Sequence, residues 1–404
     1  PRLHKALVRG LVDSGCVVRD LGVIVTPMLY YARVHFGIDG GVMITGSHNP
    51  PDENGFKLAC GEGTIYGEEI QYLREIIEKG KFASGRGEVI EDDVVTPYLE
   101  MLKEKIRLGD RRLKVAVDCG NGTASLFAEQ ILKGWGCEVI PLYCTSDGRF
   151  PAHHPDPVKT ANLQDLIKAV VEEGADLGVA YDGDADRIGV VDEKGEVIWG
   201  DKLMCLYWRE ILRSHPNALA IIEVKCSQAL VDEVTRLGGR PMFYKTGHSL
   251  IKAKMRETGA VFTGEMSGHM FFADEYYGYD DAFYATGRLL RILSNTSESL
   301  GELLKDIPKY YATAETRIPC DDRVKFKVVA DLVEKFRKDY EVIDVDGVRV
   351  LFPDGWGLVR ASNTQPVLVA RCEGKTPEAL ERICSVMKAA LVSYPEVGDF
   401  NWEF

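Results

Sequence analysis

Short apolar stretches, each followed by a polar loop and separated from the next by a helical pattern, recur from the start of the sequence to about residue 306. This alternation of strands and helices is typical of α/β domains. Open α/β sheets bind their ligands at the carboxyl ends of the strands, so the polar loops are candidate site residues. After residue 306 helices and strands are grouped instead of alternating, which predicts an α+β unit.

The length of the chain, 404 residues, fits four domains of modest size. We predict three similar α/β mixed-sheet domains followed by a smaller α+β C-terminal domain, with boundaries at 1–93, 94–198, 199–307 and 308–404. The sequence lacks an initiator methionine and begins with Pro1 at what reads as the first turn of a helix. We therefore expect the first domain to be incomplete at its N-terminus.

Charge and cysteine usage limit the possible partners. The formal net charge of −13 argues against non-specific nucleic-acid binding, and no apolar run is long enough to span a membrane. Ten cysteines are scattered without a CxxC pair, which predicts reduced thiols in the cytoplasm and not a disulfide framework. An acidic chain that binds an anion must concentrate positive charge locally.

The stretch Thr45–Pro50 follows the strand pattern Gly41–Ile44 and places Ser47 on a short loop. Two prolines fix the exit of this loop as extended chain, and Gly46 is expected to give the backbone its freedom. On the next strand, alternation points Lys57 away from its apolar neighbours, so its amine can face the serine. The alternative is an ordinary surface turn, because a loop of this kind is a weak pattern by itself.

Three aspartates, Asp182, Asp184 and Asp186, alternate in a turn between two apolar strands. Crowded carboxylates repel one another unless a cation lies among them, and Mg²⁺ prefers oxygen ligands. We predict that these aspartates bind Mg²⁺ together with an oxygen of a phosphate on Ser47. The alternatives are a solvated acidic turn, or a calcium loop between helices, but the flanking segments are strands. Arg187 follows directly and would attract a phosphate.

Further candidate residues end or follow other strands. A phosphate would suit the forked cation and donors of Arg360, Ser362, Asn363 and Thr364, and sugar hydroxyls would suit Glu265, Ser267 and His269. Lys225, Lys245 and His248 are strand-end candidates, for which solvated strand ends are the alternative. For Arg360 the alternative is a salt bridge to a carboxylate at the edge of the core. His153 and His154, flanked by prolines, are interpreted as a rigid connection in preference to a metal site.

The motifs TGSHNP, DGDADR, GEMSGH and RASNTQP, in this order and spacing, resemble those of the α-D-phosphohexomutases over essentially the whole chain. KTGHS and Trp356-Gly357 make the resemblance strongest to bacterial phosphomannomutase/phosphoglucomutase members. The resemblance implies four domains around a central active-site cleft, phosphorylation of Ser47, and Mg²⁺ held by Ser47, Asp182, Asp184 and Asp186. The implied catalytic residues are Ser47, His48, Lys57, Arg187 and His269. The implied substrate-binding residues are Lys225, Lys245, Thr246, Gly247, His248, Glu265, Ser267, Arg360, Ser362, Asn363 and Thr364.

The resemblance also implies a reaction, the reversible transfer of phosphate between the 1- and 6-positions of mannose and glucose. Phosphoserine 47 and a hexose 1,6-bisphosphate would be intermediates, and glucose or mannose 1,6-bisphosphate would be an activator. We expect a cytoplasmic monomer that acts on small hexose phosphates. A serine-dependent phosphatase and a non-catalytic sugar-phosphate sensor are the alternatives. Ala185 stands where the family usually has glycine, and the family's N-terminal segment with an active-site arginine and tyrosine is absent from this sequence.

Overall fold

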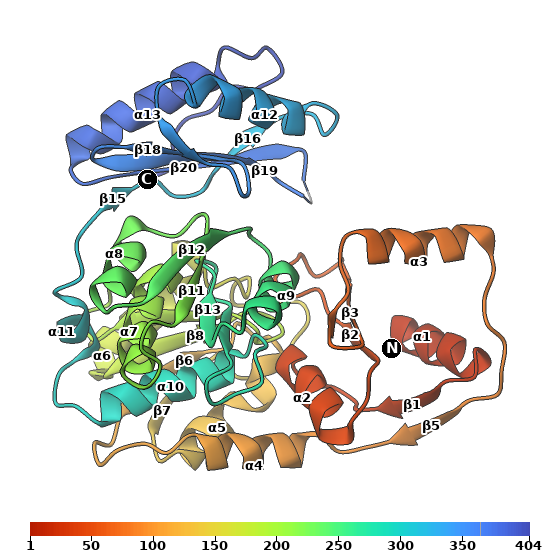
Figure 1. The fold of residues 1–404 in the computed structure, drawn as a ribbon. Coiled ribbons are helices and arrows are strands. Elements are labelled where there is room, and N and C mark those ends of the chain that lie inside the picture. The colour runs from red at the N-terminus through yellow and green to blue at the C-terminus, as the bar shows by residue number, and fades with distance from the viewer. Residues whose placement is uncertain (364) are drawn as a thin grey trace. The chain divides into compact units, whose positions relative to one another are not determined.

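The computed structural model describes residues 1–363 and 365–404, so Thr364 lies outside the described residues (Figure 1). The chain forms two compact units. The first comprises Pro1–Glu210 with His248–Lys305, and the second Ile211–Gly247 with Asp306–Phe404. The four boundaries expected from the sequence stay a prediction.

The N-terminal part of the first unit alternates helices and strands. Its elements are α1 (Arg2–Asp13), β1 (Val17–Asp20), α2 (Thr26–Phe36), β2 (Gly41–Ile44), β3 (Phe56–Cys60), β4 (Gly63–Thr64), α3 (Glu68–Lys79), β5 (Glu88–Glu91) and α4 (Val95–Lys105). β1 pairs in parallel with β5, whereas β2, β3 and β4 form a separate antiparallel sheet. The β2–β3 hairpin therefore carries the loop that begins after Ile44.

A five-stranded mixed sheet follows in the same unit. Its strands are β6 (Lys114–Asp118), β7 (Glu138–Leu142), β8 (Leu177–Tyr181), β9 (Ile188–Asp192) and β10 (Val197–Ile198). The order is β10-β9-β8-β6-β7, with β6 parallel to both β7 and β8, and β9 antiparallel to β8. The short β8–β9 connection consequently leaves the sheet at the carboxyl end of β8.

Helices cover both faces of this sheet, which explains why β8 and β9 are buried along their whole length. On one face, Leu166 and Val170 of α6 (Gln164–Glu173) pack in a cluster with Ala180 of β8. On the other face, Tyr181 contacts Phe283 of α10 (Ala282–Ser294) and hydrogen-bonds to a threonine of that helix. Neighbouring residues of a strand point to opposite faces, so the apolar run of β8 serves both layers.

The first unit is completed by a hairpin and several helices. These are α5 (Ala128–Gly134), α7 (Gly200–Ser214) as far as Glu210, α9 (His248–Thr258), β13 (Phe262–Gly264), β14 (Met270–Phe272) and α11 (Leu300–Leu304). β13 and β14 pair antiparallel in the register Phe262↔Phe272. The loop between them spans Glu265–His269, one of the predicted ligand loops.

The second unit contains a parallel strand pair and an antiparallel sheet. Its elements are β11 (Leu219–Glu223), α8 (Gln228–Arg236), β12 (Arg240–Tyr244), β15 (Tyr311–Ala312), β16 (Thr316–Pro319), α12 (Lys325–Phe336), β17 (Glu341–Ile343), β18 (Val348–Phe352), β19 (Gly355–Ala361), β20 (Val367–Gly374) and α13 (Pro377–Leu391). β11 pairs with β12, and β15 to β20 are antiparallel, in the order β15-β20-β19-β18-β17, with β16 also on β20. Figure 1 shows α12 and α13 along one face of this sheet, where both helices contribute to the core.

The predicted fold class is confirmed: mixed α/β segments precede an α+β segment of antiparallel strands and two helices. The expected strand Gly41–Ile44 is β2, with the same bounds. No helix in residues 1–363 and 365–404 is both long and apolar enough to cross a membrane.

Candidate active site

The turn after β2 holds Ser47 in an uncommon backbone conformation. Its φ is 48°, in the left-handed region that residues with a side chain rarely adopt. The Ser47 N–H donates to Thr45 Oγ1 at 2.8 Å, and the Asn49 N–H donates to the Gly46 carbonyl at 2.8 Å. The expectation that Gly46 provides the freedom of this loop was wrong, because Ser47 itself carries the left-handed conformation. Such strain costs about 1–2 kcal/mol and tends to occur at functional sites.

The acidic β8–β9 loop lies directly against this turn. Ser47 Oγ donates a hydrogen bond to Asp182 Oδ2 at 2.8 Å. A Cβ placed on Gly183 would lie 2.0 Å from the Ser47 carbonyl oxygen, so only glycine allows this approach. The loop that sequence reasoning assigned to a metal and the loop assigned to the nucleophile are therefore neighbours.

The carboxylates of Asp182, Asp184 and Asp186 are buried, and one oxygen of each lies within 4.8 Å of the others. Thr26 and Thr45 donate hydroxyl hydrogen bonds to Asp184 Oδ2 at 2.6 and 2.9 Å. Lys57, predicted to face the serine, donates to Asp184 Oδ2 at 2.7 Å and is also paired with Asp186. The amine thus supplies positive charge to the acidic loop, beside the residue that contacts Ser47.

The donor set of this loop fits a hard divalent cation. Asp184 Oδ1 and Asp186 Oδ1 are buried and accept no hydrogen bond from any described residue. Burial and the charges of Asp184 and Asp186 raise the pKa of Asp182 well above its ordinary value. Burial alone would raise the pKa of Asp184 too, but Lys57 and the hydrogen bonds to this carboxylate outweigh it and lower the pKa. Orphaned carboxylate oxygens are the ligands that such an ion prefers.

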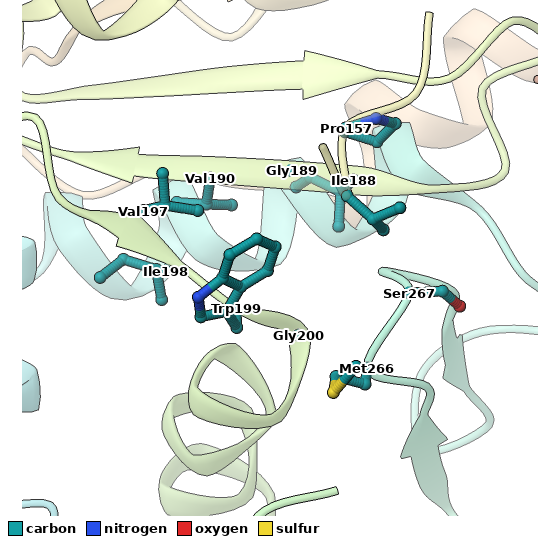
Figure 2. A pocket seen from close by; sticks show the side chains of 11 residues that line it. Pro157, Ile188, Gly189, Val190, Val197, Ile198, Trp199, Gly200, Met266 and Ser267 are labelled. Atoms are coloured by element: carbon teal, nitrogen blue, oxygen red, sulfur yellow. The ribbon is translucent and has the colours of Figure 1, made fainter. Parts of the chain in front are cut away.

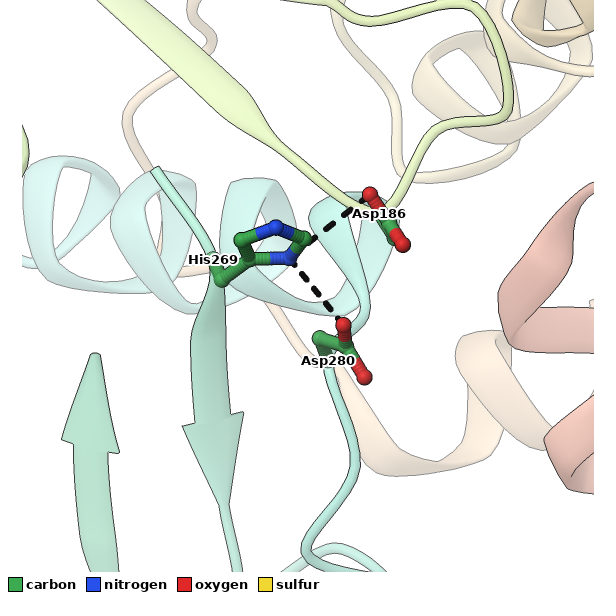
Figure 3. Close-up of side chains that lie close together, drawn as sticks. All are labelled: Asp186, His269 and Asp280. Atoms are coloured by element: carbon green, nitrogen blue, oxygen red, sulfur yellow. Dashed lines mark ion pairs between the residues drawn. The ribbon is translucent and has the colours of Figure 1, made fainter. Parts of the chain in front are cut away.

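His269 connects this loop to a second group of buried charges (Figure 3). Its Nε2 accepts a hydrogen bond from Arg187 Nε at 3.0 Å. Its Nδ1 lies 3.0 Å from Asp280 Oδ2 and 3.6 Å from Asp186 Oδ1, as the dashed lines in Figure 3 mark. Burial lowers the pKa of His269 to about 4, so the imidazole is neutral near pH 7. The neutral ring therefore presents the lone pair of Nε2 to Arg187.

Two residues of α9 reach the same group. His248 stacks on His269 with ring centroids 5.3 Å apart, and its Nδ1 lies 3.4 Å from Asp280 Oδ2. Lys252, one turn further along the helix, donates to Asp280 Oδ1 at 2.7 Å. Burial raises the pKa of Asp280, but Lys252 and the two histidines outweigh this effect and hold that pKa well below its ordinary value. Asp280 is thus an anion in the protein interior.

The loop around His153 and His154 contacts the serine turn through His154. His154 Nε2 donates to the backbone oxygen of His48, and His48 Nδ1 lies 3.7 Å from Asp156 Oδ2. His153 Nε2 pairs with Asp118 at 3.0 Å. Within the described part of the chain, the metal-compatible clusters include neither histidine. The interpretation of this segment as a rigid connection stays a prediction.

The β13–β14 loop with Glu265 and Ser267 packs on the start of β9. Gly268 has a φ of 94°, and a Cβ there would lie 2.3 Å from the Ile188 carbonyl oxygen. Ile188 N–H in turn donates to the Gly268 carbonyl at 3.1 Å. A pocket opens beside this loop, and Figure 2 shows Ser267, Met266 and Trp199 among its walls. Glu265 is buried at 3% exposure, close to the loop's turn.

The remaining predicted residues lie in the second unit. Two acidic side chains there, Asp346 and Glu223, accept hydrogen bonds from some of them. Asp346 Oδ2 accepts from the Thr246 N–H at 3.0 Å and from Arg360 Nε at 2.9 Å. Glu223 Oε1 accepts from Thr246 Oγ1 at 2.7 Å and lies 3.5 Å from Lys225 Nζ. The salt bridge considered as an alternative for Arg360 is therefore present, with Asp346 as its partner. It also joins the KTG and RASN segments within this unit.

Some predicted residues have plainer surroundings. Lys245 and Asn363 are exposed, Gly247 has a φ of 129°, and Ser362 Oγ accepts from the Gln365 N–H at 3.2 Å. Lys225 Nζ also donates to Glu315 at 2.6 Å.

Sequence reasoning missed several residues at these sites. They are Thr26, Asp156, Lys252, Asp280 and Asp346. Only Lys252 carried a local signal, because it follows His248 by four residues and so shares one helix face with it. The others reach the site through contacts between distant segments.

Comparison with known proteins identifies the class to which this fold and site belong. Four family models match in order, and all four describe phosphoglucomutase/phosphomannomutase domains. They are α/β/α domain I at residues 1–84, α/β/α domain II at 96–195, α/β/α domain III at 199–311 and the C-terminal domain at 315–390. The chain belongs to the phosphoglucomutase/phosphomannomutase family, whose members are isomerases that transfer a phosphoryl group on hexose phosphates.

Individual relatives agree with this assignment. A phosphomannomutase/phosphoglucomutase of Pseudomonas aeruginosa is 47% identical over 396 residues, covering 97% of this chain and 84% of its own. A phosphoglucomutase of Neisseria gonorrhoeae is 45% identical over 402 residues, covering 98% and 87%. A crystal structure of a family protein from Burkholderia thailandensis superposes with a TM-score of 0.91 at 41% identity, covering 100% of this chain and 88% of the other.

Proposed function

We propose that this protein interconverts the 1- and 6-phosphates of mannose and glucose through a phosphorylated Ser47 and a hexose 1,6-bisphosphate. The observation that carries the proposal is the 2.8 Å hydrogen bond from Ser47 Oγ to Asp182 in a loop of three buried carboxylates. A serine held rigidly beside a cation site and two basic side chains suits phosphoryl transfer, which depends on positioning and charge neutralisation.

The proposed cation is Mg²⁺, held by Asp182, Asp184, Asp186 and an oxygen on Ser47. The buried, unpartnered Oδ1 atoms of Asp184 and Asp186 support this assignment. When bound, the ion would neutralise negative charge on the phosphoryl group.

Four other residues of the first unit have proposed roles in the transfer. Lys57 and Arg187 supply positive charge at the acidic loop that Ser47 contacts, and His269 Nε2 accepts the proton of the hexose hydroxyl that attacks the phosphoryl group. His48 steadies the serine turn through its contacts with His154 and Asp156.

The sugar and its second phosphate need separate recognition. We assign the sugar hydroxyls to Glu265 and Ser267 of the β13–β14 loop, with His248, which stacks on His269 at the end of the same loop. Phosphate binding in the second unit is assigned to Arg360, helped by Ser362, Asn363 and Thr364. Lys225, Lys245, Thr246 and Gly247 complete the proposed substrate-binding set.

The proposal extends to the conditions of activity. Glucose or mannose 1,6-bisphosphate would rephosphorylate Ser47 after loss of the phosphoryl group and act as activator. A cytoplasmic monomer is proposed from the composition, and size-exclusion chromatography with light scattering tests the monomer.

One incubation separates the proposed reaction from its rivals. The protein receives glucose 1-phosphate, Mg²⁺ and a trace of glucose 1,6-bisphosphate, and both glucose 6-phosphate and free phosphate are measured. A mutase yields the 6-phosphate, a phosphatase releases inorganic phosphate, and a sensor yields neither. Ser47→Ala should abolish turnover, whereas Ser84→Ala, at an exposed serine, should leave it unchanged. Near-normal turnover by the Ser47 variant would reject the covalent mechanism.

A further inference from the structure

The contacts of His269 define which of its nitrogens carries the proton. Arg187 Nε always bears a hydrogen, and it donates to His269 Nε2 at 3.0 Å. Nε2 must therefore present its lone pair, and the single proton of the neutral ring lies on Nδ1. Nδ1 faces Asp280 Oδ2 at 3.0 Å, without the alignment of a strong hydrogen bond, and Asp186 Oδ1 is further away at 3.6 Å.

Asp280 is not one of the proposed ligands of the cation, yet burying its charge costs free energy. The side chain is fully buried, with Lys252 Nζ on one oxygen at 2.7 Å and His248 Nδ1 3.4 Å from the other. Lys252 itself is 3% exposed and lies over the Tyr30 ring at 4.2 Å. Buried ion pairs contribute little net stability compared with apolar packing, so a pair in this position calls for a role other than stabilisation.

We propose that Asp280 is a positioning residue that holds His269 in the Nδ1–H tautomer, with Nε2 turned toward Arg187. Lys252 and His248 fix the Asp280 carboxylate as an anion in the orientation that Nδ1 requires. Figure 3 shows both carboxylates on the Nδ1 side of the imidazole, and the shorter of the two marked contacts runs to Asp280. The arrangement follows the general rule that the partner of one ring nitrogen decides the chemistry of the other.

This inference rests on the proposed function, in which the lone pair of His269 Nε2 accepts a proton. As a hexose oxygen forms its bond to phosphorus, the bond from phosphorus to Ser47 Oγ breaks, and Oγ keeps the electron pair. In this proposal the Arg187 hydrogen bond to His269 Nε2 breaks, and the hydroxyl proton moves to the freed Nε2 lone pair. In the return transfer the bonds change in the opposite sense, and His269 gives the proton back to the hexose oxygen. Asp280 takes no proton and acts only through the imidazole.

The first test is Asp280→Asn in the full-length chain, compared with the matched control Asp281→Asn. Asp281 is equally buried and adjacent, but it caps α10 and accepts from Tyr98 and Tyr276. Asp280→Asn should lower kcat and leave KM nearly unchanged, with a ceiling of about 10²- to 10⁴-fold, the usual contribution of a general base. The control should keep its kcat. A wild-type kcat for Asp280→Asn would overturn the proposal.

A double-mutant cycle separates positioning from structural damage. If Asp280 acts through the imidazole, Asp280→Asn should have no further effect on kcat once His269→Ala is present. Multiplicative losses would overturn the proposal. Should the single variant fold poorly because Lys252 loses its partner, Asp280→Asn combined with Lys252→Met removes both charges and takes its place.

Nitrogen-15 NMR of histidine-labelled protein tests the tautomer without any turnover. The wild type should show His269 with its proton on Nδ1, and Asp280→Asn should shift the population toward Nε2–H. A proton on Nε2 in the wild type would refute the inference even if mutase activity is found. Conversely, absence of 6-phosphate product with the expected tautomer would reject the proposed function and leave the positioning by Asp280 supported.

Discussion

The approach of the acidic loop to the serine turn allows a quantitative prediction at Gly183. In Gly183→Ala the new Cβ would start 2.0 Å from the Ser47 carbonyl oxygen, although Cβ atoms in proteins essentially never approach other atoms within 3.0 Å. The two loops must therefore separate by about 1 Å, and a misplacement of about 1 Å costs about 10²-fold in rate. The strain itself should cost about 1–3 kcal/mol of stability.

A coupled dehydrogenase assay for glucose 6-phosphate measures this effect, at a temperature where denaturation curves show each variant to be folded. Gly148→Ala is the matched control, since a Cβ there meets no atom within 4 Å and should change neither kcat nor stability. We expect kcat of Gly183→Ala to fall about 100-fold. A Gly183→Ala protein with the kcat of the control would refute the reasoning that this backbone approach places Ser47 for catalysis.

Four further predictions concern other residues. Asp184→Asn should weaken Mg²⁺ binding in a calorimetric titration much more than sugar-phosphate binding; an unchanged metal affinity would contradict the assigned site. Arg360→Ala should raise KM for the 1- and 6-phosphates by similar factors, equivalent to roughly 1.5–3 kcal/mol for a charged hydrogen bond; a lower melting temperature with unchanged KM would make its pairing with Asp346 purely structural. Ala185 has a φ of 57°, in the left-handed region that glycine adopts without strain. Ala185→Gly removes this strain but adds the entropy cost of a glycine, so it should raise the unfolding free energy by up to about 1 kcal/mol in denaturant unfolding. Burial raises the pKa of Asp281 to about 6. The neutral carboxyl therefore contributes to stability below pH 4, and this contribution is lost as the pH rises to about 6. Over that range the unfolding free energy of the wild type should fall by up to about 3 kcal/mol relative to Asp281→Asn.

Local sequence patterns were sufficient for much of the fold. The strand pattern Gly41–Ile44 has the same bounds in the structure, and helix α13 begins after an N-cap threonine with a proline in its first turn, a local start signal. The strand preceding Asp182 reads as a continuous apolar run because both of its faces are covered by helices. Signals of this kind lie within one or two turns of chain, so they are legible without knowledge of distant contacts.

The order of the four motifs also determined the family, since each motif occupies a strand end where ligand loops are expected. Residue types alone indicated the acidic loop, the serine and the basic side chains as candidates. The sequence could not distinguish an Arg360 that binds phosphate from one that pairs with a carboxylate, and the structure shows the pairing with Asp346.

Only the tertiary structure decided the backbone of Ser47, the glycine-limited approach of Gly183, and the tautomer of His269 with its partner Asp280. Each depends on atoms that are far apart in sequence. Ser47 and Gly183 lie in loops that follow strands of different sheets, and Asp280 lies on a loop that α9 reaches through Lys252. The energies of these contacts depend on distances of a few ångströms and on the loss of water around buried charge. Residue type and spacing carry no such distances, so they identify the chemical groups of a site but not the geometry that couples them.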